Sequence, residues 1–308
     1  MKSKVLLAAM TFLIPLTFFS CSSNKKPVGA KVIGVSLLTR GHIFYRDLED
    51  GLKAEADKDR YQLIITSADF DLNKQISQVE DFVARKVDAI VVCPVDSKGV
   101  GPAIEEANRA DIPVFTADIA AEKGSVVSHI ASDNVAGGRL AGEYLAKFLN
   151  GKGDVAIINQ PAITSVLDRV KGFMQAISKY PGIKIVADVN GQGVRDRSLQ
   201  AAADVLQSHP DLNGIFGIND DSALGALDAV KQFNRKGISI VGYDATPPAR
   251  KEILEGSSLK ADVIQNPNLI GTRTVQKIKE YLEGKRVPKI VPVDVGIVDQ
   301  ATLENESK

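Results

Sequence analysis

From Lys31 onward, short apolar runs alternate with stretches of helical periodicity, and this alternation restricts the possible folds more than any other feature. In the helical stretches apolar residues recur every three or four positions, as in Leu48, Leu52 and Ala56. The apolar runs have the length of β-strands and lie at 32–36, 62–67, 89–94, 113–117, 126–131, 154–159, 183–189, 214–219, 238–243 and 261–265. Such a regular alternation predicts an α/β fold.

Many of the runs read as continuous valine and isoleucine, for example "AIVV" at 89–92. Strands of this kind are buried on both faces, as in a parallel sheet covered by helices. Ten strands are many for one doubly wound sheet, so we expect two similar doubly wound parallel sheets in two lobes.

The N-terminus resembles an export signal. Lys2 and Lys4 precede an apolar run over 5–19, and Ser20 is followed by Cys21. The run is shorter than the ~20 apolar residues that span a bilayer. We expect a signal peptide over 1–20, lipidation of Cys21 as in bacterial lipoproteins, and a polar tether over 21–30. The alternative is an ordinary signal peptide with an incidental cysteine.

Composition excludes several classes of protein. The net charge is zero and no basic run occurs, so we expect no nucleic acid partner. Cys93, the second of two cysteines, lies in an apolar run and is predicted to be a buried thiol without a disulfide. Only three histidines are present and they are widely separated, so no metal site is expected. No nucleophile-elbow, phosphate-loop or metalloprotease motif occurs, so we expect neither catalysis nor a cofactor.

Polar residues collect where the predicted strands end. They are Ser36, Asp118, Asn219, Asp244 and Gln265. Each one alone is explained as a helix cap or a turn residue. Together they predict a shared polar cleft, because ligands of open α/β sheets bind beyond the carboxyl ends of the strands.

An ordered series of motifs resembles the ribose-binding branch of the type I periplasmic binding proteins. The motifs are "PVDS" (94–97), "VVSHIASDN" (126–134), Gly137-Gly138, "IND" with "ALGAL" (218–227), "VGYDATP" (241–247) and "IQNPNLIG" (264–271). The resemblance extends from about Lys31 to Gln300. It implies two similar lobes joined by three crossings, which close over a sugar. The N-lobe would be 31–132 plus 266–293, and the C-lobe 133–265 plus 294–308.

The resemblance also implies roles for particular residues. Asp118, Asn219, Asp244 and Gln265 match positions that hydrogen-bond sugar hydroxyls. Phe44 and Tyr45 match an aromatic pair that packs against the sugar ring. These residue types suit a sugar, whose hydroxyls need donors and acceptors and whose C–H faces pack on aromatic rings.

Other positions depart from the ribose pattern. Ile119 replaces an arginine, and Gly193 lies where a third aromatic ring is expected. Arg169 lies near a second binding arginine, and His42 lies in a longer first loop as a possible hydroxyl partner. The ligand is therefore left open among pentoses, hexoses, ketoses and polyols.

The favoured function is a monomeric lipoprotein, anchored to a membrane at Cys21 in the periplasm, that delivers a monosaccharide to an ABC permease. The alternative is a periplasmic sensor that presents the same ligand to a membrane receptor kinase. A transcription regulator with a similar core would need an N-terminal helix-turn-helix, and a signal peptide occupies that place.

Overall fold

The computed structural model of the chain describes residues 31–306. The predicted signal peptide, the lipidation at Cys21 and the tether lie outside the described residues.

The described residues form two six-stranded sheets. The first has the order β11 (Ile290–Val293), β5 (Ser128–Ser132), β4 (Val114–Ala117), β3 (Ala89–Val92), β1 (Val32–Leu37) and β2 (Gln62–Ser67). The second has the order β12 (Gly296–Asp299), β10 (Leu259–Ile264), β9 (Ser239–Asp244), β8 (Leu212–Gly217), β6 (Lys152–Asn159) and β7 (Gly182–Asn190). All neighbouring strands are parallel except β12, which is antiparallel to β10. The predicted fold of two doubly wound parallel-sheet lobes is confirmed.

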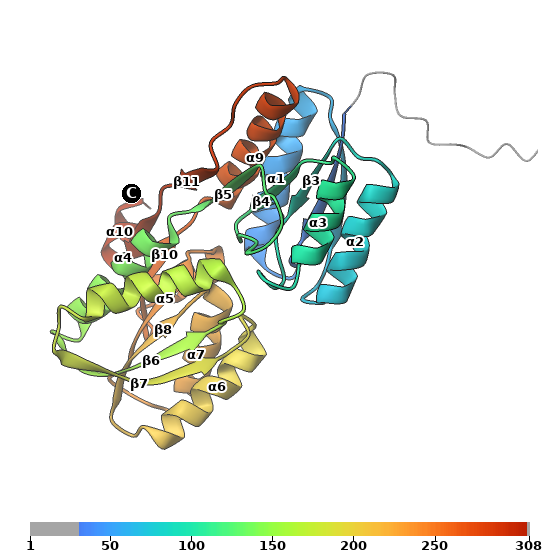
Figure 1. The fold of residues 1–308 in the computed structure, drawn as a ribbon. Helices are drawn as coiled ribbons and strands as arrows, with labels where there is room; N and C mark the ends of the chain where they lie inside the picture. Colours follow the sequence, from blue (N-terminus) through green and yellow to red (C-terminus); the bar gives the residue numbers. More distant parts are fainter. Residues whose placement is uncertain (1–30, 307–308) are drawn as a thin grey trace, which may run out of the picture. The chain divides into compact units, whose positions relative to one another are not determined.

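Helices cover both faces of each sheet (Figure 1). In the first lobe α1 (Ile43–Lys58) packs with α9 (Pro267–Leu282), and α2 (Leu72–Ala84) packs with α3 (Gly101–Arg109). In the second lobe α4 (Asn134–Phe148) packs with α5 (Thr164–Ile177), and α6 (Arg195–Ser208) packs with α7 (Asp220–Gln232). The short helices α8 (Pro247–Leu254) and α10 (Gln300–Glu306) contact each other beside β12.

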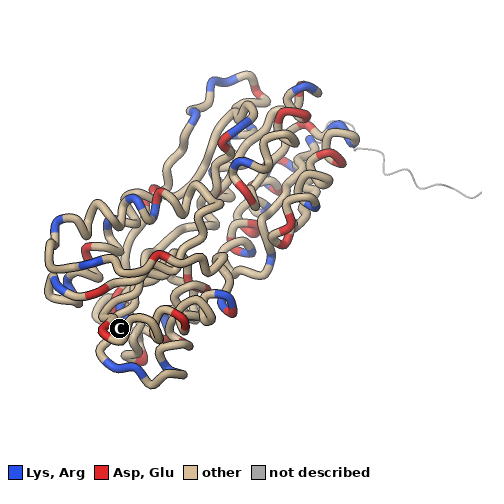
Figure 2. The backbone as a smooth tube through the Cα atoms, turned by 60° about the horizontal axis from the view of Figure 1, so that its bottom comes forward, with Lys and Arg blue, Asp and Glu red and all other residues tan. Residues whose placement is uncertain are grey.

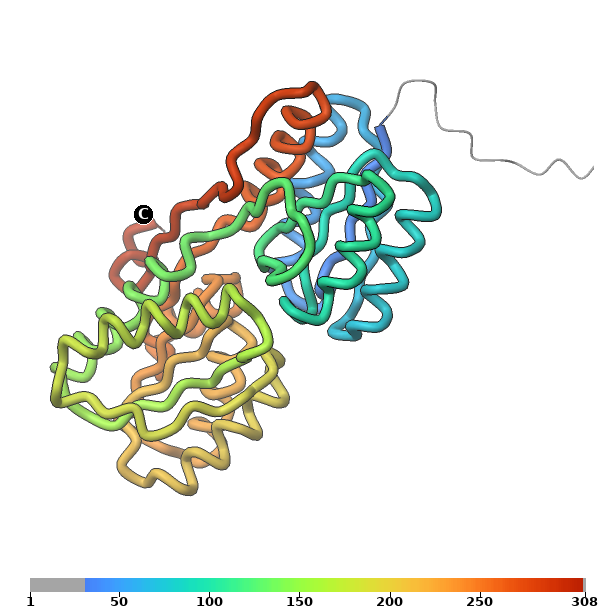
Figure 3. The backbone as a smooth tube through the Cα atoms, viewed as in Figure 1, coloured from blue at the N-terminus to red at the C-terminus, as the bar shows by residue number. Residues whose placement is uncertain are grey.

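The chain crosses between the sheets after β5, after β10 and after β11 (Figure 3). The last crossing needs only the two residues between β11 and β12. The first lobe is therefore built from two separate parts of the sequence, because β11 completes its sheet.

The interior follows from the apolar runs. All six residues of β1 are buried, and Phe173 of α5 stacks on Phe216 of β8 with the ring centroids 4.5 Å apart. The thiol of Cys93 is free and buried, as predicted, and burial raises its pKa well above the ordinary value.

Glycine allows α4 and α5 to approach closely. A Cβ atom on Gly138 would lie 1.9 Å from the carbonyl oxygen of Arg169, and one on Gly137 would lie 2.1 Å from the hydroxyl of Tyr243. No side chain fits at either distance. The Gly137-Gly138 pair thus allows close helix packing. The contact at Gly138 sets how closely the backbone of α5 at Arg169 approaches α4.

Lysine and arginine alternate with aspartate and glutamate along both lobes of the described chain (Figure 2). Within 31–306, no helix combines the length and the apolar character that crossing a bilayer requires.

Candidate functional site

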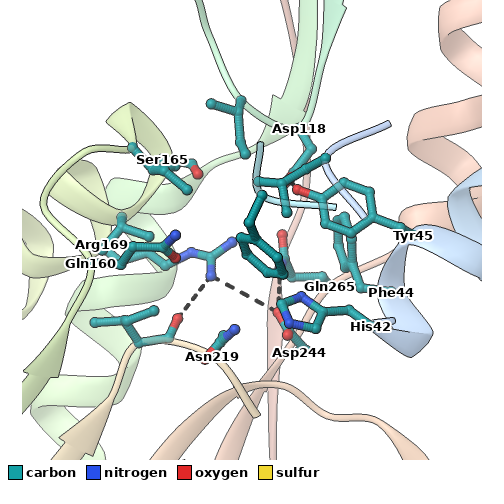
Figure 4. A pocket seen from close by; sticks show the side chains of 16 residues that line it. His42, Phe44, Tyr45, Asp118, Gln160, Ser165, Arg169, Asn219, Asp244 and Gln265 are labelled. Atoms are coloured by element: carbon teal, nitrogen blue, oxygen red, sulfur yellow. Dashed lines mark hydrogen bonds and ion pairs between the residues drawn. The ribbon is translucent and has the colours of Figure 1, made fainter. Parts of the chain in front are cut away.

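One pocket brings together residues from both sheets (Figure 4). It holds about 400 Å³ of space outside the protein atoms, part of it open to solvent. Its lining includes every side chain for which the sequence predicts a ligand contact, namely His42, Phe44, Tyr45, Asp118, Arg169, Asn219, Asp244 and Gln265. Half of them, Asp118, Asn219, Asp244 and Gln265, lie at or just beyond the carboxyl ends of strands, where open α/β sheets bind ligands. Their roles in binding stay predictions.

Two of the acidic residues have unusual backbone conformations. Asp118, directly after β4, has a φ of 65°, and the Ile119 N–H donates to the Ala117 carbonyl at 2.7 Å, which closes a γ-turn. Asp244, the last residue of β9, has a φ of 121°. Such conformations are strained in residues other than glycine, and they concentrate at functional sites. In both places the strain lies at a carboxylate that lines the pocket.

One oxygen of the Asp118 carboxyl group has no hydrogen-bond donor within the protein. The Tyr45 hydroxyl donates to Asp118 Oδ2 at 2.7 Å, while Asp118 Oδ1 is buried without a protein donor. Burial raises the pKa of Asp118, although the charge of Arg169 and the Tyr45 hydroxyl act against this rise. A ligand hydroxyl would satisfy the free oxygen.

Aromatic rings form one wall of the pocket. Phe44 and Tyr45, in the first turn of α1, meet edge to face with ring centroids 5.2 Å apart. Phe70, in the loop after β2, contacts His42 with a centroid separation of 5.4 Å. Both Phe44 and Tyr45 are buried and also belong to the core of the first lobe. Packing in the core therefore holds the rings of Phe44 and Tyr45 in place, whereas Phe70 is more exposed.

Arg169 lies on the other side of the pocket from these rings (Figure 4), and two of its three nitrogens are hydrogen-bonded to the protein. Its Nε donates to Asn134 Oδ1 at 2.8 Å, and its Nη1 donates to the Ile218 carbonyl at 2.8 Å. The guanidinium lies 3.9 Å from the ring centroid of Tyr243. Its Nη1 also lies 3.9 Å from Asp244 Oδ1. Arg169 thus gives the pocket a fixed positive charge, with donor capacity left at Nη2.

Asn219 has a structural role as well as a position in the pocket. Its Oδ1 caps α7 by accepting from the Ser222 N–H at 2.9 Å, and its Nδ2 donates to the Gly193 carbonyl at 3.0 Å. Asn219 is therefore a helix cap, which was the alternative explanation for the polar residues at strand ends. A side-chain amide has two N–H donors, so one remains for a ligand.

Asp244 and Gln265 form a pair across neighbouring strands. Gln265 Nε2 donates to Asp244 Oδ1 at 2.6 Å, and Gln265 Oε1 is buried without a donor. Burial raises the pKa of Asp244 well above its ordinary value, against the charge of Arg169.

Direct contacts join the two lobes on either side of the pocket. His42 Nε2, before α1, lies 3.0 Å from Asp221 Oδ2 on α7. Burial lowers the pKa of His42, and the charge of Asp221 opposes this, so a neutral ring donates to the carboxylate near neutral pH. On the other side, Ser97 Oγ accepts from the Thr164 N–H at 3.1 Å, and Thr164 Oγ1 donates to the Ala120 carbonyl at 3.2 Å.

Several polar groups lie away from the pocket, including Ser36, which the sequence analysis placed in the polar cleft. Ser36 is buried and bonded to Gln78, Arg40 pairs with Glu49, and His129 bonds Thr116. The strand-end rule is therefore wrong for Ser36, because its hydroxyl points to α2.

The pocket also contains residues that the sequence reasoning missed, chiefly Phe70, Gln160 and Ser165. Gln160 follows directly after β6, so the strand-end rule would have found it if it had been applied to that strand. Phe70 lies three residues past β2, and an aromatic ring gives no polar signal. Ile119 lines the pocket as an apolar residue, whereas Gly193 does not line it and accepts from Asn219 Nδ2 through its carbonyl.

A sequence model described as a periplasmic binding protein domain matches residues 33–286. The chain belongs to the periplasmic binding protein family. The ribose import binding protein RbsB of Escherichia coli (strain K12) is 34% identical over 287 residues, which cover 93% of this chain and 96% of that protein. The predicted resemblance to the ribose-binding branch is thereby confirmed.

Solved structures agree with this assignment. An ABC transporter solute binding protein from Mycobacterium smegmatis with bound glycerol has a TM-score of 0.85 and 33% identity, covering 90% of this chain and 96% of that one. The fructose binding periplasmic domain of a hybrid two component system has a TM-score of 0.84 and 28% identity, covering 90% and 93%. Periplasmic binding proteins bind solutes and are not enzymes, and the family implies a periplasmic location.

Proposed function

We propose that this periplasmic binding protein captures a neutral monosaccharide or a related polyol in the pocket and delivers it to an ABC importer. The observation that carries the proposal is the pair of buried acceptors, Asp118 Oδ1 and Gln265 Oε1, that have no protein donor. An unsatisfied buried group costs about 1–3 kcal/mol, and a ligand with several hydroxyls would supply both donors. The rings of Phe44 and Tyr45 would pack against its C–H face.

The ligand class follows from the same pocket. The name of the Escherichia coli relative points to ribose, and the glycerol in the Mycobacterium smegmatis structure is a polyol. Ile119 removes a charge that the ribose pattern would place in the pocket, and Phe70 adds an aromatic ring to the lining. Pentoses, hexoses, ketoses and polyols are therefore all candidates, with Arg169 as the fixed cation of the site.

Closure of two lobes around the ligand would be the mechanism. We assign 31–132 plus 266–293 to the N-lobe and 133–265 plus 294–308 to the C-lobe, which follows the membership of the strands in the two sheets. A ligand that touches Tyr45 or Asp118 on one lobe and Asp244 on the other favours the closed state, because only that state offers both sets of contacts.

A thermal-shift screen of the mature, untagged protein tests the ligand class. The panel contains D-ribose, D-allose, D-fructose, D-galactose, xylitol and glycerol, with gluconate as an anionic comparison. A ligand at about 100 times its Kd should stabilise the protein by about 2.7 kcal/mol. Stabilisation by at least one neutral sugar or polyol and none by gluconate is the expected result. No stabilisation by any neutral member would overturn the proposed ligand class.

Substitution of Asp244 tests the assignment of the site. Asp244→Ala removes an acceptor and leaves Gln265 Nε2 without its partner. We expect the affinity for the sugar identified by the screen to fall at least about tenfold, or ~1.4 kcal/mol, with the fold intact. Isothermal titration and circular dichroism measure the two effects, and Asp204→Asn on the exposed side of α6 is the matched control. An unchanged titration curve would remove Asp244 from the site.

Lipidation at Cys21 is a second part of the proposal, and it would anchor the protein, which we expect to be a monomer, to a membrane. Cys21→Ser should move the protein from the membrane fraction to the soluble periplasmic fraction. Mass spectrometry of the mature N-terminus should show a diacylglyceryl adduct on the wild type only. A soluble wild type with an unmodified N-terminus would favour an ordinary signal peptide.

The alternative function is a sensor, and the likeness to the fructose binding domain of a two component system favours it. The two functions share the pocket and differ in the membrane partner. Cross-linking of the ligand-bound protein in cells, followed by identification of the captured membrane protein, separates them. A permease subunit supports transport, whereas a receptor kinase supports sensing.

A further inference from the structure

Two buried carboxyl groups lie behind the part of β9 that carries Asp244. Asp220 is the first residue of α7 and is 5% exposed, and Asp262 lies in β10 and is 0% exposed. Neither lines the pocket, and within 31–306 neither belongs to a cluster that could hold a metal ion.

Glycine makes the space for this pair. A Cβ atom on Gly242 of β9 would lie 2.4 Å from Asp262 Oδ2 and 3.0 Å from Ala223 Cβ on α7. The carboxyl group of Asp262 therefore fills the volume that a side chain at 242 would need. Charged residues are almost never fully buried without a partner, so this arrangement needs a physical explanation.

One oxygen of each carboxyl group holds the backbone that follows Asp244. Asp262 Oδ1 accepts from the Ala245 N–H at 3.1 Å. Asp220 Oδ2 accepts from the Thr246 N–H at 2.7 Å and from the Thr246 hydroxyl. These bonds fix a segment in which Asp244 and Ala245 have φ values of 121° and 56°. Strained backbone of this kind persists only where surrounding contacts impose it.

The other two oxygens, Asp220 Oδ1 and Asp262 Oδ2, are buried without any donor. The two side chains lie within hydrogen-bonding reach of each other. If both carboxyl groups were ionised, two like charges would lie close together in a buried site, and these two oxygens would still lack donors. A single proton between them converts this repulsion into a hydrogen bond, as in other carboxyl pairs that share a site.

None of the charged groups described around the pair neutralises the two carboxylates. Asp221 of α7 and Asp244 of β9 are acidic and add to the repulsion. Arg250 of α8 donates to the Ala245 carbonyl and pairs with Glu306. Arg169 of α5 lies beside Asp244, and His42 lies beside Asp221. On β12, next to β10, Asp299 accepts from Thr302.

We propose that Asp220 and Asp262 share one proton near neutral pH and act as positioning residues, which hold the segment 244–246 so that Asp244 faces the pocket. The shared proton then becomes a requirement for ligand binding, and affinity falls as the pH rises and the proton leaves. The link to a ligand rests on the proposed function, whereas the shared proton and the held segment do not.

Burial is the main reason why the pair keeps its proton. It raises the pKa of Asp220 to about 6 and that of Asp262 well above its ordinary value. The charge of Asp220 adds to the rise at Asp262, whereas the hydrogen bond with Asp262 acts against the rise at Asp220, as in a pair that holds its proton on Asp262. Because the raised pKa belongs to the folded state, the stabilising contribution is complete at acid pH. It is lost as the pH rises through the pKa of the pair.

Asp262→Asn is the decisive variant, because its amide can donate to Asp220 and accept from Ala245 without a titrating proton. Asp262→Ala removes both bonds, and Asp204→Asn on α6 is the control. The first measurement, on ligand-free protein near pH 7, is the infrared carbonyl band of protonated carboxyl groups. Part of this band should disappear in Asp262→Asn and persist in Asp204→Asn. An identical band in Asp262→Asn and the control would overturn the shared proton.

The second measurement is hydrogen exchange of the peptide that contains 244–246, corrected for intrinsic rates, at about pH 5.5 and about pH 8.5 without ligand. In the wild type we expect at least about tenfold loss of protection at the higher pH, and in Asp262→Asn less than about twofold. Asp262→Ala should be unprotected at both. Equal pH dependence in the wild type and Asp262→Asn would overturn the positioning role. Neither result depends on which ligand the pocket takes, so a failed ligand screen leaves this test intact.

Discussion

At the scale of the residue, Asp118 shows how the fold prepares one side chain for a ligand. A γ-turn holds it at a φ of 65°, Tyr45 donates to one of its oxygens, and the other is buried with no protein donor. The strain and the unsatisfied oxygen each cost on the order of 1–3 kcal/mol. Both costs are understandable if a ligand hydroxyl completes the arrangement.

Tyr45→Phe tests this preparation. The substitution removes only the hydroxyl that donates to Asp118 Oδ2 and leaves a buried carboxylate with no donor. We expect a loss of about 1–3 kcal/mol in the free energy of unfolding and weaker sugar binding. Urea denaturation and titration calorimetry measure the two quantities. The exposed Tyr281→Phe is the control, and equal stability of the two variants would show that the hydroxyl is not needed.

We expect the folded protein to lose stability in acid because of His129. It lies in β5 between β4 and β11, where burial lowers its pKa from 6.5 to about 4. A lowered pKa in the folded state contributes stability that is present above the unfolded value and is lost as the pH falls from about 6.5 towards about 4. The full effect is about 3.5 kcal/mol, at ~1.4 kcal/mol per pH unit. His129→Asn should flatten this part of the curve of unfolding free energy against pH, and parallel curves would contradict the account.

At the scale of the element, the strands were predictable where they are continuous apolar runs, and each of the ten predicted runs overlaps a strand. β11 and β12 were missed. β11 is a partly exposed edge strand that contains Pro292, and β12 is a short antiparallel edge strand. An edge strand buries too little to leave a continuous apolar signal. The pocket was predictable where polar residues end strands, but Phe70 lies on a loop whose path depends on the tertiary structure.

The close packing of α4 on α5 should position Arg169 in the pocket, and a substitution at Gly138 tests this. In Gly138→Ala the new methyl would lie 1.9 Å from the Arg169 carbonyl oxygen, so α5 must move. We expect a loss of about 1–3 kcal/mol in stability, as for overpacked cores. Because the movement shifts the guanidinium, we also expect weaker ligand binding. Lys171→Ala, on the exposed face of the same helix, is the control in both measurements. Normal stability and binding in Gly138→Ala would show that α5 can yield without displacing Arg169.

At the scale of the whole molecule, the contacts between the lobes set how easily the pocket closes. The contact of His42 with Asp221 lies on one side, and the bonds of Thr164 with Ser97 and Ala120 lie on the other. An apparent affinity falls in proportion to the fraction of molecules that can adopt the binding-competent state. Residues outside the pocket can therefore tune affinity through this fraction.

Thr164→Val isolates this effect, because Thr164 contacts the other lobe and does not line the pocket. Loss of its hydroxyl bond should weaken binding by about two- to fivefold through a faster dissociation rate, with the association rate little changed. Stopped-flow fluorescence measures both rates. Ser178→Ala, whose hydroxyl bonds only within its own helix end, is the control. An unchanged dissociation rate would mean that this bond does not stabilise the closed state.

The order of the strands also has a consequence for biosynthesis. β11 closes the edge of the first sheet, yet it follows β10, the last parallel strand of the second sheet, in the sequence. While the chain emerges from its N-terminus, the first lobe keeps an open edge until the second lobe is almost complete. Completion of the first sheet therefore waits until nearly all of the second lobe has been made, so the last step of folding should join the two lobes.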